Sequence, residues 1–275
     1  MSFTTADVVK LRKATGAGMM DCKNALTEAE GNFDRAVDII RERGKLVASK
    51  RADREATEGV VLAKVTADQK FGALVVLNCE TDFVAKNEKF IAFTQQILDL
   101  AIANQPANLE ELKALLLEDR SVEAHVTEQT GVIGEKLDLS YYGKVSAEYV
   151  TAYIHPGNKL ATLVGFNKAG FEVQIAKDVA MQVAAMNPVA INRESVSQEV
   201  VEKELEIAKE KFRQEGKPEA MLDKIAMGAL NKWFQESTLL EQTYVKDGKI
   251  SIKEFLAQND KTLTVTAFDR FALEG

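Results

Sequence analysis

The segment from Asn78 to Asn87 places an acidic side chain directly beside a large aromatic one, in Asp82-Phe83. Asp82 could approach a cation or a hydrogen-bond donor of another molecule, and Phe83 could fill an apolar pocket there. An exposed phenyl ring has little use unless a partner covers it. The same residues also fit a structural arrangement, in which Asp82 caps the following helix and Phe83 folds back as a hydrophobic staple. The residues by themselves favour neither interpretation.

Two other places offer candidate contact residues. Met19 and Met20 follow a glycine-containing break, and adaptable methionine side chains suit a binding surface, although such residues are more often part of a core. His155 falls at the tip of a predicted hairpin. Tip residues are usually neutral surface, but a tip is also well placed for contact with a partner.

The sequence carries no motif for catalysis, nucleotide binding or metal binding. The patterns GxxxxGK[ST], HExxH and GxSxG are absent, there are only two histidines, and Cys22 and Cys79 do not form a CxxC pair. We therefore expect no catalytic residue, no metal and no cofactor. An enzyme with its site between two subdomains would need a deep cleft lined by carboxylates of strongly shifted pKa.

Composition limits the class of protein. The chain has 275 residues, of which 46% are hydrophobic and 28% charged, enough for two or three domains with their own cores. A net charge of −7 argues against a nucleic-acid partner. The first seven residues lack a positive start and an apolar core, and no apolar run approaches the roughly 20 residues that span a bilayer. We expect a cytoplasmic protein with no membrane partner and with reduced cysteines.

Residues 1–45 predict a unit of three helices. Thr4 or Thr5 caps the first, the second runs from Met19 to about Glu28, and the third has an apolar stripe that ends at Gly44. The charged residues 46–58 are predicted to be a helical extension or linker.

The middle of the chain contains a weak repeat of a β-hairpin followed by a helix. Strand-rich residues 59–78 precede a predicted helix at 87–104, and residues 149–166 precede a helix that ends before Pro188. The offset between the copies falls from 89 residues in the strands to 82 in the helices, so the first copy has seven extra residues, within 79–88. Extra loop length on a rigid scaffold is where function tends to lie.

Residues 195–235 predict a helical hairpin. Ser197 caps a helix with a coiled-coil seam, and Gly216-Lys217-Pro218 turns the chain into a return helix. A short helix containing Ile252 and a last strand from Thr262 to Phe268 complete the chain. The fold class is therefore predicted to be α+β.

Two strings resemble the signatures of the elongation factor Ts family. The first is Leu11-Arg12-Lys13-Ala14-Thr15-Gly16-Ala17-Gly18-Met19-Met20-Asp21-Cys22-Lys23-Asn24-Ala25-Leu26, and the second is Asn78-Cys79-Glu80-Thr81-Asp82-Phe83-Val84-Ala85-Lys86. Both are long and specific, and the order of parts agrees over nearly the whole chain.

The resemblance implies a domain plan. It comprises a ubiquitin-associated-like three-helix domain, two related subdomains with antiparallel sheets and helices, and a projecting coiled-coil arm. On this sequence the parts are 1–45 for the three-helix domain, 46–58 for the linker, 59–145 for the first core subdomain, 146–194 with 236–275 for the second, and 195–235 for the arm.

The resemblance also implies a partner and a task. The partner is elongation factor Tu, GDP-bound or nucleotide-free, and the task is release of GDP so that GTP can bind. By position, the implied contact residues are Thr81, Asp82, Phe83, Val84, His155, Arg12, Met19 and Met20. Asp82 and Phe83 would enter near the partner's magnesium and nucleotide. The sequence leaves open a homodimer through the subdomains or the arm, and an adaptor that binds a peptide or protein through its three-helix domain.

Overall fold

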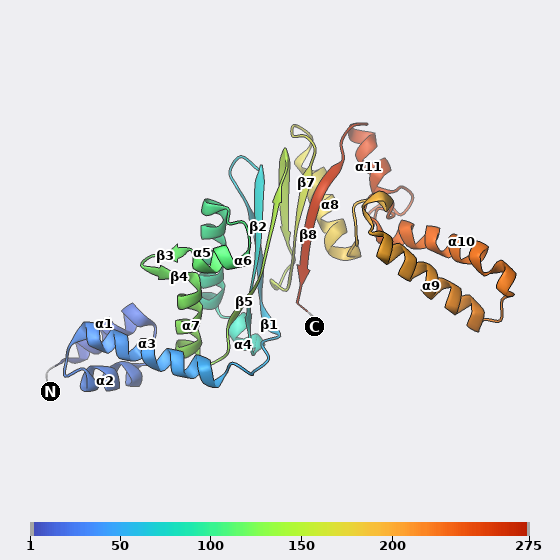
Figure 1. Ribbon diagram of the computed structural model, residues 1–275. Helices are drawn as coiled ribbons and strands as arrows, with labels where there is room; N and C mark the ends of the chain where they lie inside the picture. Colours follow the sequence, from blue (N-terminus) through green and yellow to red (C-terminus); the bar gives the residue numbers. More distant parts are fainter. Residues whose placement is uncertain (1–2, 274–275) are drawn as a thin grey trace.

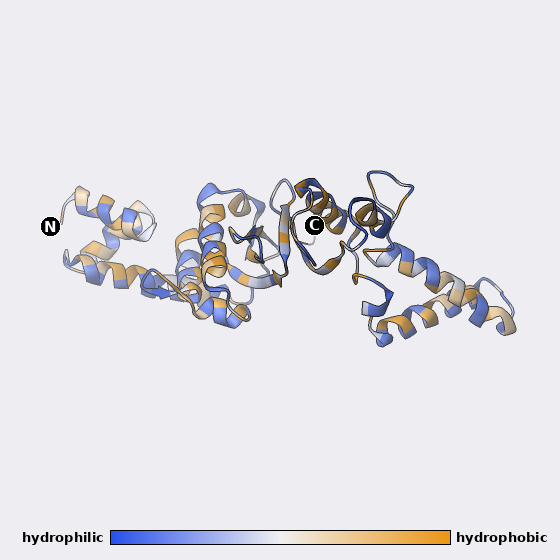
Figure 2. Cartoon of the chain, turned by 90° about the horizontal axis from the view of Figure 1, so that it is seen from above, coloured by the Kyte–Doolittle hydropathy of each residue, from blue (hydrophilic) through white to orange (hydrophobic). Residues whose placement is uncertain are grey.

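The computed structural model describes residues 3–273. Residues 1–2 of the predicted three-helix domain and residues 274–275 of the predicted second core subdomain lie outside the described residues. The molecule is elongated. A small helical unit lies at one end, two β-sheets with their helices form the middle, and a helical hairpin extends from the other end (Figure 1). The view from above shows the same order (Figure 2). The α+β class predicted from the sequence is confirmed.

The N-terminal unit consists of α1 (Thr5–Thr15), α2 (Met19–Glu28) and α3 (Phe33–Lys50). Thr4 caps α1, and the Asp7 carboxylate accepts the Thr4 backbone N–H at 2.8 Å, which completes a capping box. The core residues are Val8, Leu11, Ala17, Cys22, Ala25, Leu26, Ala29, Ala36 and Ile39.

One prediction for this unit is wrong. The third helix does not end at Gly44 but continues to Lys50, so residues 46–50 form the helical extension that was one of the two predictions for 46–58. At Gly44 the helix packs against a second helix, α7 (Val122–Ile133), whose Gly131 lies directly against the Gly44 backbone.

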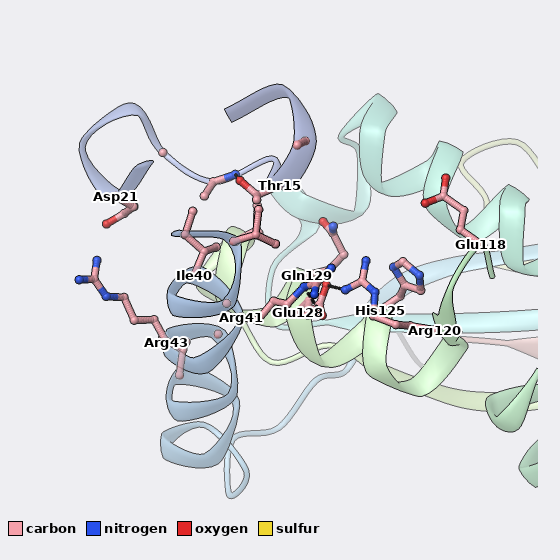
Figure 3. Close-up of a pocket in the computed structure, with 18 residues that line it drawn as sticks. Thr15, Asp21, Ile40, Arg41, Arg43, Glu118, Arg120, His125, Glu128 and Gln129 are labelled. Carbon is pink, nitrogen blue, oxygen red and sulfur yellow. Dashed lines mark hydrogen bonds and ion pairs between the residues drawn. The ribbon is translucent and has the colours of Figure 1, made fainter. Parts of the chain in front are cut away.

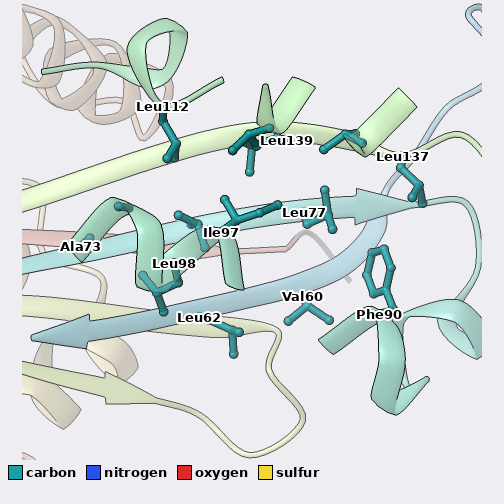
Figure 4. Packing of buried hydrophobic residues seen from close by; sticks show 14 of the residues in the cluster. Val60, Leu62, Ala73, Leu77, Phe90, Ile97, Leu98, Leu112, Leu137 and Leu139 are labelled. Atoms are coloured by element: carbon teal, nitrogen blue, oxygen red, sulfur yellow. The ribbon is translucent and has the colours of Figure 1, made fainter. Parts of the chain in front are cut away.

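The first sheet is antiparallel in the order β1-β2-β5, and helices cover one of its faces. Its strands are β1 (Glu58–Val65), β2 (Phe71–Cys79) and β5 (Asp138–Ser146), and its helices include α5 (Glu88–Asn104), α6 (Leu109–Ala114) and α7, with a small ribbon of β3 (Leu116–Leu117) and β4 (Arg120–Ser121). Figure 4 shows Ile97, Leu98 and Phe90 packed against the strands. Burying such side chains stabilises the fold by about 1.5–3 kcal/mol each.

The second sheet has the corresponding order β6-β7-β8 and is covered by α8. Its elements are β6 (Tyr149–Ile154), β7 (Leu160–Phe166), β8 (Val265–Ala272) and α8 (Val173–Met186), with α11 (Ile252–Asn259) before the last strand. In each sheet the second strand of a hairpin is central, and a later strand pairs with its free edge.

The two sheets pack face to face through apolar side chains. Leu74 and Val76 of β2 meet Val150 and Leu163 of the second sheet, and all four are buried. The Val150 N–H also donates to the Gln69 carbonyl at 2.6 Å, which ties the β1–β2 turn to the start of β6. The layers are therefore helices, sheet, sheet and helix.

Two strands differ from the sequence predictions. No strand was predicted at β5, yet it pairs with β2 along most of its length. The last strand was predicted at 262–268 but lies at Val265–Ala272. Thr262 instead belongs to a turn, because its N–H and hydroxyl both donate to Asp260 Oδ1, at 2.8 and 2.9 Å.

The helical hairpin consists of α9 (Gln198–Gln214) and α10 (Glu219–Ser237), preceded by a 3-10 turn at Arg193–Ser195. Ala208 and Leu222 are buried between the helices, and hydrophobic and hydrophilic residues alternate along both (Figure 2). Arg193 joins the base to the body through two hydrogen bonds to the Glu241 carboxylate, at 2.5 and 2.6 Å. Over residues 3–273, every helix is too short or too polar to cross a membrane.

Candidate functional site

The candidate site is built on a short turn between β2 and α5, which we call the Asp-Phe turn (residues 81–85). It contains the one-turn helix α4 (Asp82–Ala85) and occupies the segment that the repeat marks as extra. Thr81 caps α4 by accepting the Val84 N–H at 3.4 Å, and Asn87 caps α5. Asp82 therefore does not cap the following helix, and the structural interpretation of the segment is wrong on that point.

The Asp-Phe turn has one buried side and one exposed side. Ala85 is buried and Val84 packs against the core of the first sheet. Phe83 is 84% exposed, so it does not fold back as a staple. A ring held away from its own core leaves its apolar surface in water, where burial by another molecule would stabilise a complex.

Asp82 presents a charged group on the same turn. Its carboxylate accepts a hydrogen bond from Lys86 Nζ at 2.6 Å, and its side chain remains 42% exposed. The hydrogen bond from Lys86 lowers the pKa of Asp82, and the charge of Lys159 adds to the effect. Asp82 is therefore ionised at neutral pH and accessible to a second molecule.

A pair of carboxylates lies beneath the turn, and we call Glu80 and Glu135 the carboxylate clamp. Glu135 Oε2 accepts the backbone N–H groups of Glu80 and Thr81 at 3.1 and 3.0 Å, and its Oε1 accepts the Thr81 hydroxyl at 2.7 Å. Glu80 Oε1 in turn accepts from the Lys136 N–H at 2.6 Å and from Arg51 Nη1 at 2.7 Å. The Lys136 N–H bond, followed by that from Arg51, lowers the pKa of Glu80 below its usual value.

Sequence reasoning did not identify Glu135 or the role of Glu80. Glu135 lies 54 residues from Thr81 and belongs to no motif. The only local signal is Gly134, which ends α7 with φ +81° and turns the chain toward β2.

His155 lies at the same end of the sandwich as the Asp-Phe turn. It is exposed at the tip of the β6–β7 hairpin, and its Nδ1 lies 2.9 Å from the Tyr153 hydroxyl. Lys159, on the same hairpin, pairs with Glu58 at 2.9 Å, and Glu58 begins β1 beside the turn. The sequence-predicted residues His155, Asp82 and Phe83 therefore lie at the same end of the two sheets.

Arg12 belongs to α1, and Met19 and Met20 begin α2, so all three lie in the N-terminal unit, which Figure 1 shows at one end of the molecule. All three are exposed, and the exposed fraction of Met20 is 63%. The structure does not bring them to the Asp-Phe turn. It connects the two places through α3, whose end reaches the clamp at Arg51.

A cavity of about 340 Å³ lies between the N-terminal unit and α7 (Figure 3). Arg41 and Arg120 both pair with Glu128 there, the former at 3.6 Å, and His125 Nε2 lies 2.7 Å from the Leu117 carbonyl. The cavity touches neither Asp82 nor Phe83. Apolar side chains of the two sheets pack against one another in the space between them.

The part of the chain that the structure describes contains no group of three or more histidine, cysteine, aspartate or glutamate side chains that could hold a metal ion.

Comparison with known proteins gives one consistent result. A family model described as elongation factor TS matches residues 80–274. A protein named elongation factor Ts from Porphyromonas gingivalis is 54% identical over 275 residues, covering 99% of each chain. Proteins of the same name from Christiangramia forsetii and Flavobacterium psychrophilum are 52% and 47% identical, covering 98% and 99% of each chain.

Proposed function

The chain belongs to the elongation factor Ts family of translation elongation factors, and from this premise we propose that it binds elongation factor Tu in its GDP-bound state and promotes release of GDP. It then leaves the nucleotide-free partner open to GTP. The protein acts as an exchange factor and supplies binding energy rather than catalytic groups.

The observation that carries the proposal is the exposure of Phe83 on a turn that is otherwise packed. The ring is 84% exposed while Ala85, two residues later, is 8% exposed. Such a ring is ready to enter an apolar gap in a partner without unfolding the turn that bears it. We propose that Phe83 enters between helices of the partner's GTPase domain, beside the bound nucleotide.

Free energies indicate how much this contact can achieve. An exchange factor and GDP weaken each other's binding by the same factor, and each tenfold of that coupling corresponds to about 1.4 kcal/mol. Burial of one phenylalanine side chain is worth about 1.5–3 kcal/mol. Phe83 can therefore supply roughly one to two factors of ten, and a broader interface must supply the remainder.

Asp82 acts on the partner's metal in this proposal. Magnesium requires nearly octahedral oxygen coordination and tolerates distortion poorly. The ionised Asp82 carboxylate, brought near that site beside the inserted ring, disturbs the ligands of magnesium. Once the metal is loosened, the phosphates of GDP lose a major source of their binding energy.

The remaining contact residues help to bind the partner and do not act on its GDP directly. We propose that Thr81 and Val84 support the turn against the partner and that His155 contacts it from the same face. Arg12, Met19 and Met20 form a second contact on the N-terminal unit, which we take to be a ubiquitin-associated-like domain. The family membership supports this two-part interface in a cytoplasmic protein.

An adaptor that binds a peptide through the N-terminal unit is the alternative. Such a protein has no use for an exposed ring and an ionised carboxylate held on a packed turn some distance from that unit. The Asp-Phe turn therefore favours nucleotide exchange.

Stopped-flow release of a fluorescent GDP analogue tests the proposal. Purified elongation factor Tu loaded with the analogue is mixed with excess unlabelled GDP, with and without this protein. We expect release to accelerate with factor concentration and then to saturate. A release rate that does not change at any concentration of the factor would overturn the proposed function.

A further inference from the structure

We propose that Glu135 is a positioning residue for GDP release, and that its carboxylate fixes the direction in which the Asp-Phe turn presents Phe83. This inference rests on the proposed function, because it concerns the same turn. It assigns a role to a residue that belongs to neither signature of the family and lies between α7 and β5 in the sequence.

The turn cannot hold its direction alone. The helix α4 has four residues, and isolated helices of that length are not stable in water. Phe83 makes no compensating contact, since its ring is exposed. The orientation of the ring must therefore come from the residues on which the turn rests.

Glu135 supplies that support through three hydrogen bonds to two consecutive residues. It accepts the N–H groups of Glu80 and Thr81 and the Thr81 hydroxyl. Hydrogen bonds to an ionised acceptor are shorter and stronger than neutral ones. The same Thr81 hydroxyl caps α4, so Glu135 orients the residue that begins the helix.

The support is reciprocal. While Glu135 accepts from the Glu80 backbone, the Glu80 carboxylate accepts from the backbone of Lys136, the residue after Glu135. Each segment thus holds the other by a side chain bonded to a main-chain N–H. Two antiparallel contacts of this kind restrict rotation of the turn about either one.

The clamp also includes the end of α3. Arg51 Nη1 donates to the Glu80 carboxylate, and Lys136 Nζ donates to the carbonyls of Ala52 and Arg54 at 2.8 and 2.9 Å. The helix that carries the N-terminal unit therefore ends on the residues that hold the Asp-Phe turn. Docking of the N-terminal unit and the direction of Phe83 are set by one connected group of contacts.

The test uses the full chain with Glu135→Gln, which keeps the size of the side chain but replaces one acceptor oxygen by an amide N–H₂ group that cannot accept. GDP release from elongation factor Tu is measured over a range of factor concentrations. A misplacement of about 1 Å at a reacting centre can cost roughly 100-fold in rate. We expect kcat to fall at least about tenfold and KM to stay within about twofold, because the docking residues are unchanged.

Glu123→Gln is the matched control. Glu123 is an exposed glutamate in the first turn of α7 and has no role in the clamp. It should leave both parameters at wild-type values. Hydrogen exchange on the wild-type protein adds a measurement that needs no variant: the amides of Glu80 and Thr81 should be protected. Rapid exchange of both amides would overturn the proposal.

The double variant Phe83→Ala with Glu135→Gln separates positioning from general stability. Because Glu135 acts through the ring, Glu135→Gln should cause no further loss of kcat once the ring is absent. An equal loss in both backgrounds, or an unchanged kcat in Glu135→Gln alone, would overturn the inference. If Phe83→Ala itself keeps full activity, the proposed role of Phe83 in GDP release is overturned and the inference falls with it, whereas the exchange function itself is tested by release with and without the factor.

Discussion

The backbone of Gly131 in α7 lies directly against that of Gly44 in α3. A Cβ atom placed on Gly131 would stand 2.2 Å from the Cα atom of Gly44, a separation that real atoms do not tolerate. Two helices from different parts of the chain approach this closely because Gly131 has no side chain at the crossing point, whereas a Cβ atom on Gly44 would lie 3.7 Å from its nearest neighbours. This contact fixes the N-terminal unit to the body of the protein.

Gly131→Ala is therefore expected to destabilise the protein, although alanine favours helices. Overpacking of a tight contact typically costs about 1–3 kcal/mol. The control is Gly228→Ala in α10, where nothing lies within 4 Å of the added methyl group and alanine should stabilise by up to about 1 kcal/mol. Urea unfolding of both variants provides the measurement. Equal free energies of unfolding for the two variants would contradict the proposed crossing.

The buried carboxyl group of Asp269 should give stability an unusual pH dependence. Its Oδ1 accepts the Tyr141 hydroxyl at 2.7 Å between the two sheets, while its Oδ2 is buried without a hydrogen-bond partner. Burial raises the pKa of Asp269 above its ordinary value of 3.8. The contribution of Asp269 to the free energy of unfolding is thus fully present below pH 3.8 and is lost as pH rises through its raised pKa. Asp269→Asn should match the wild type near pH 3 and be more stable at pH 7.

Asp260→Asn is the control of opposite sign. The hydrogen bond from Lys168, at 2.5 Å, and those from Thr262 lower the pKa of Asp260 to about 2. The stability from Asp260 is therefore present above 3.8 and is lost as pH falls through about 2. This variant should be less stable than the wild type at pH 7. Thermal unfolding between pH 3 and 7 measures the stability of both variants. If both changed stability in the same direction at pH 7, the opposite pKa shifts assigned to Asp269 and Asp260 would be contradicted.

Cys79 should be chemically inert in the folded protein. It is fully buried, its thiol donates to the Thr81 carbonyl at 3.2 Å, and burial together with the charge of Glu135 raises its pKa to about 12. Because the thiolate is the reactive form, iodoacetamide at pH 8 should label Cys79 only after unfolding. Mass spectrometry of native and urea-treated samples measures this. Labelling of the native protein as fast as that of a free peptide would contradict the packing beneath the turn.

Much of the fold follows from local sequence patterns, and the exceptions have physical causes. The turn at Gly216-Lys217-Pro218 and the caps at Thr4 and Ser197 were predicted because each depends on neighbouring residues. The strand β5 was missed because it is stabilised by pairing with β2, 60 or more residues earlier in the chain. The continuation of α3 past Gly44 depends on Gly131, which no local pattern connects to it.

The sequence predicts the residues of the candidate site but not the contacts that hold them in place. The seven extra residues of the repeat directed attention to Asp82 and Phe83, and their sequence could not decide whether the ring was buried. The ring is exposed on a turn that Glu135 contacts from a distant segment through the Thr81 hydroxyl. The positions of His155 and of Met20 relative to the turn likewise follow from tertiary packing, so the sequence could name them without placing them together or apart.

The most direct test of the account is GDP release from elongation factor Tu by Phe83→Ala at saturating concentration. The account predicts that the complex still forms, since Arg12, Met19, Met20 and His155 remain, while the release rate falls about 10- to 100-fold. Leu116→Ala is the control, because Leu116 is a 64% exposed apolar residue far from the turn, and it should release GDP at the wild-type rate. Release by Phe83→Ala at the wild-type rate would contradict the account.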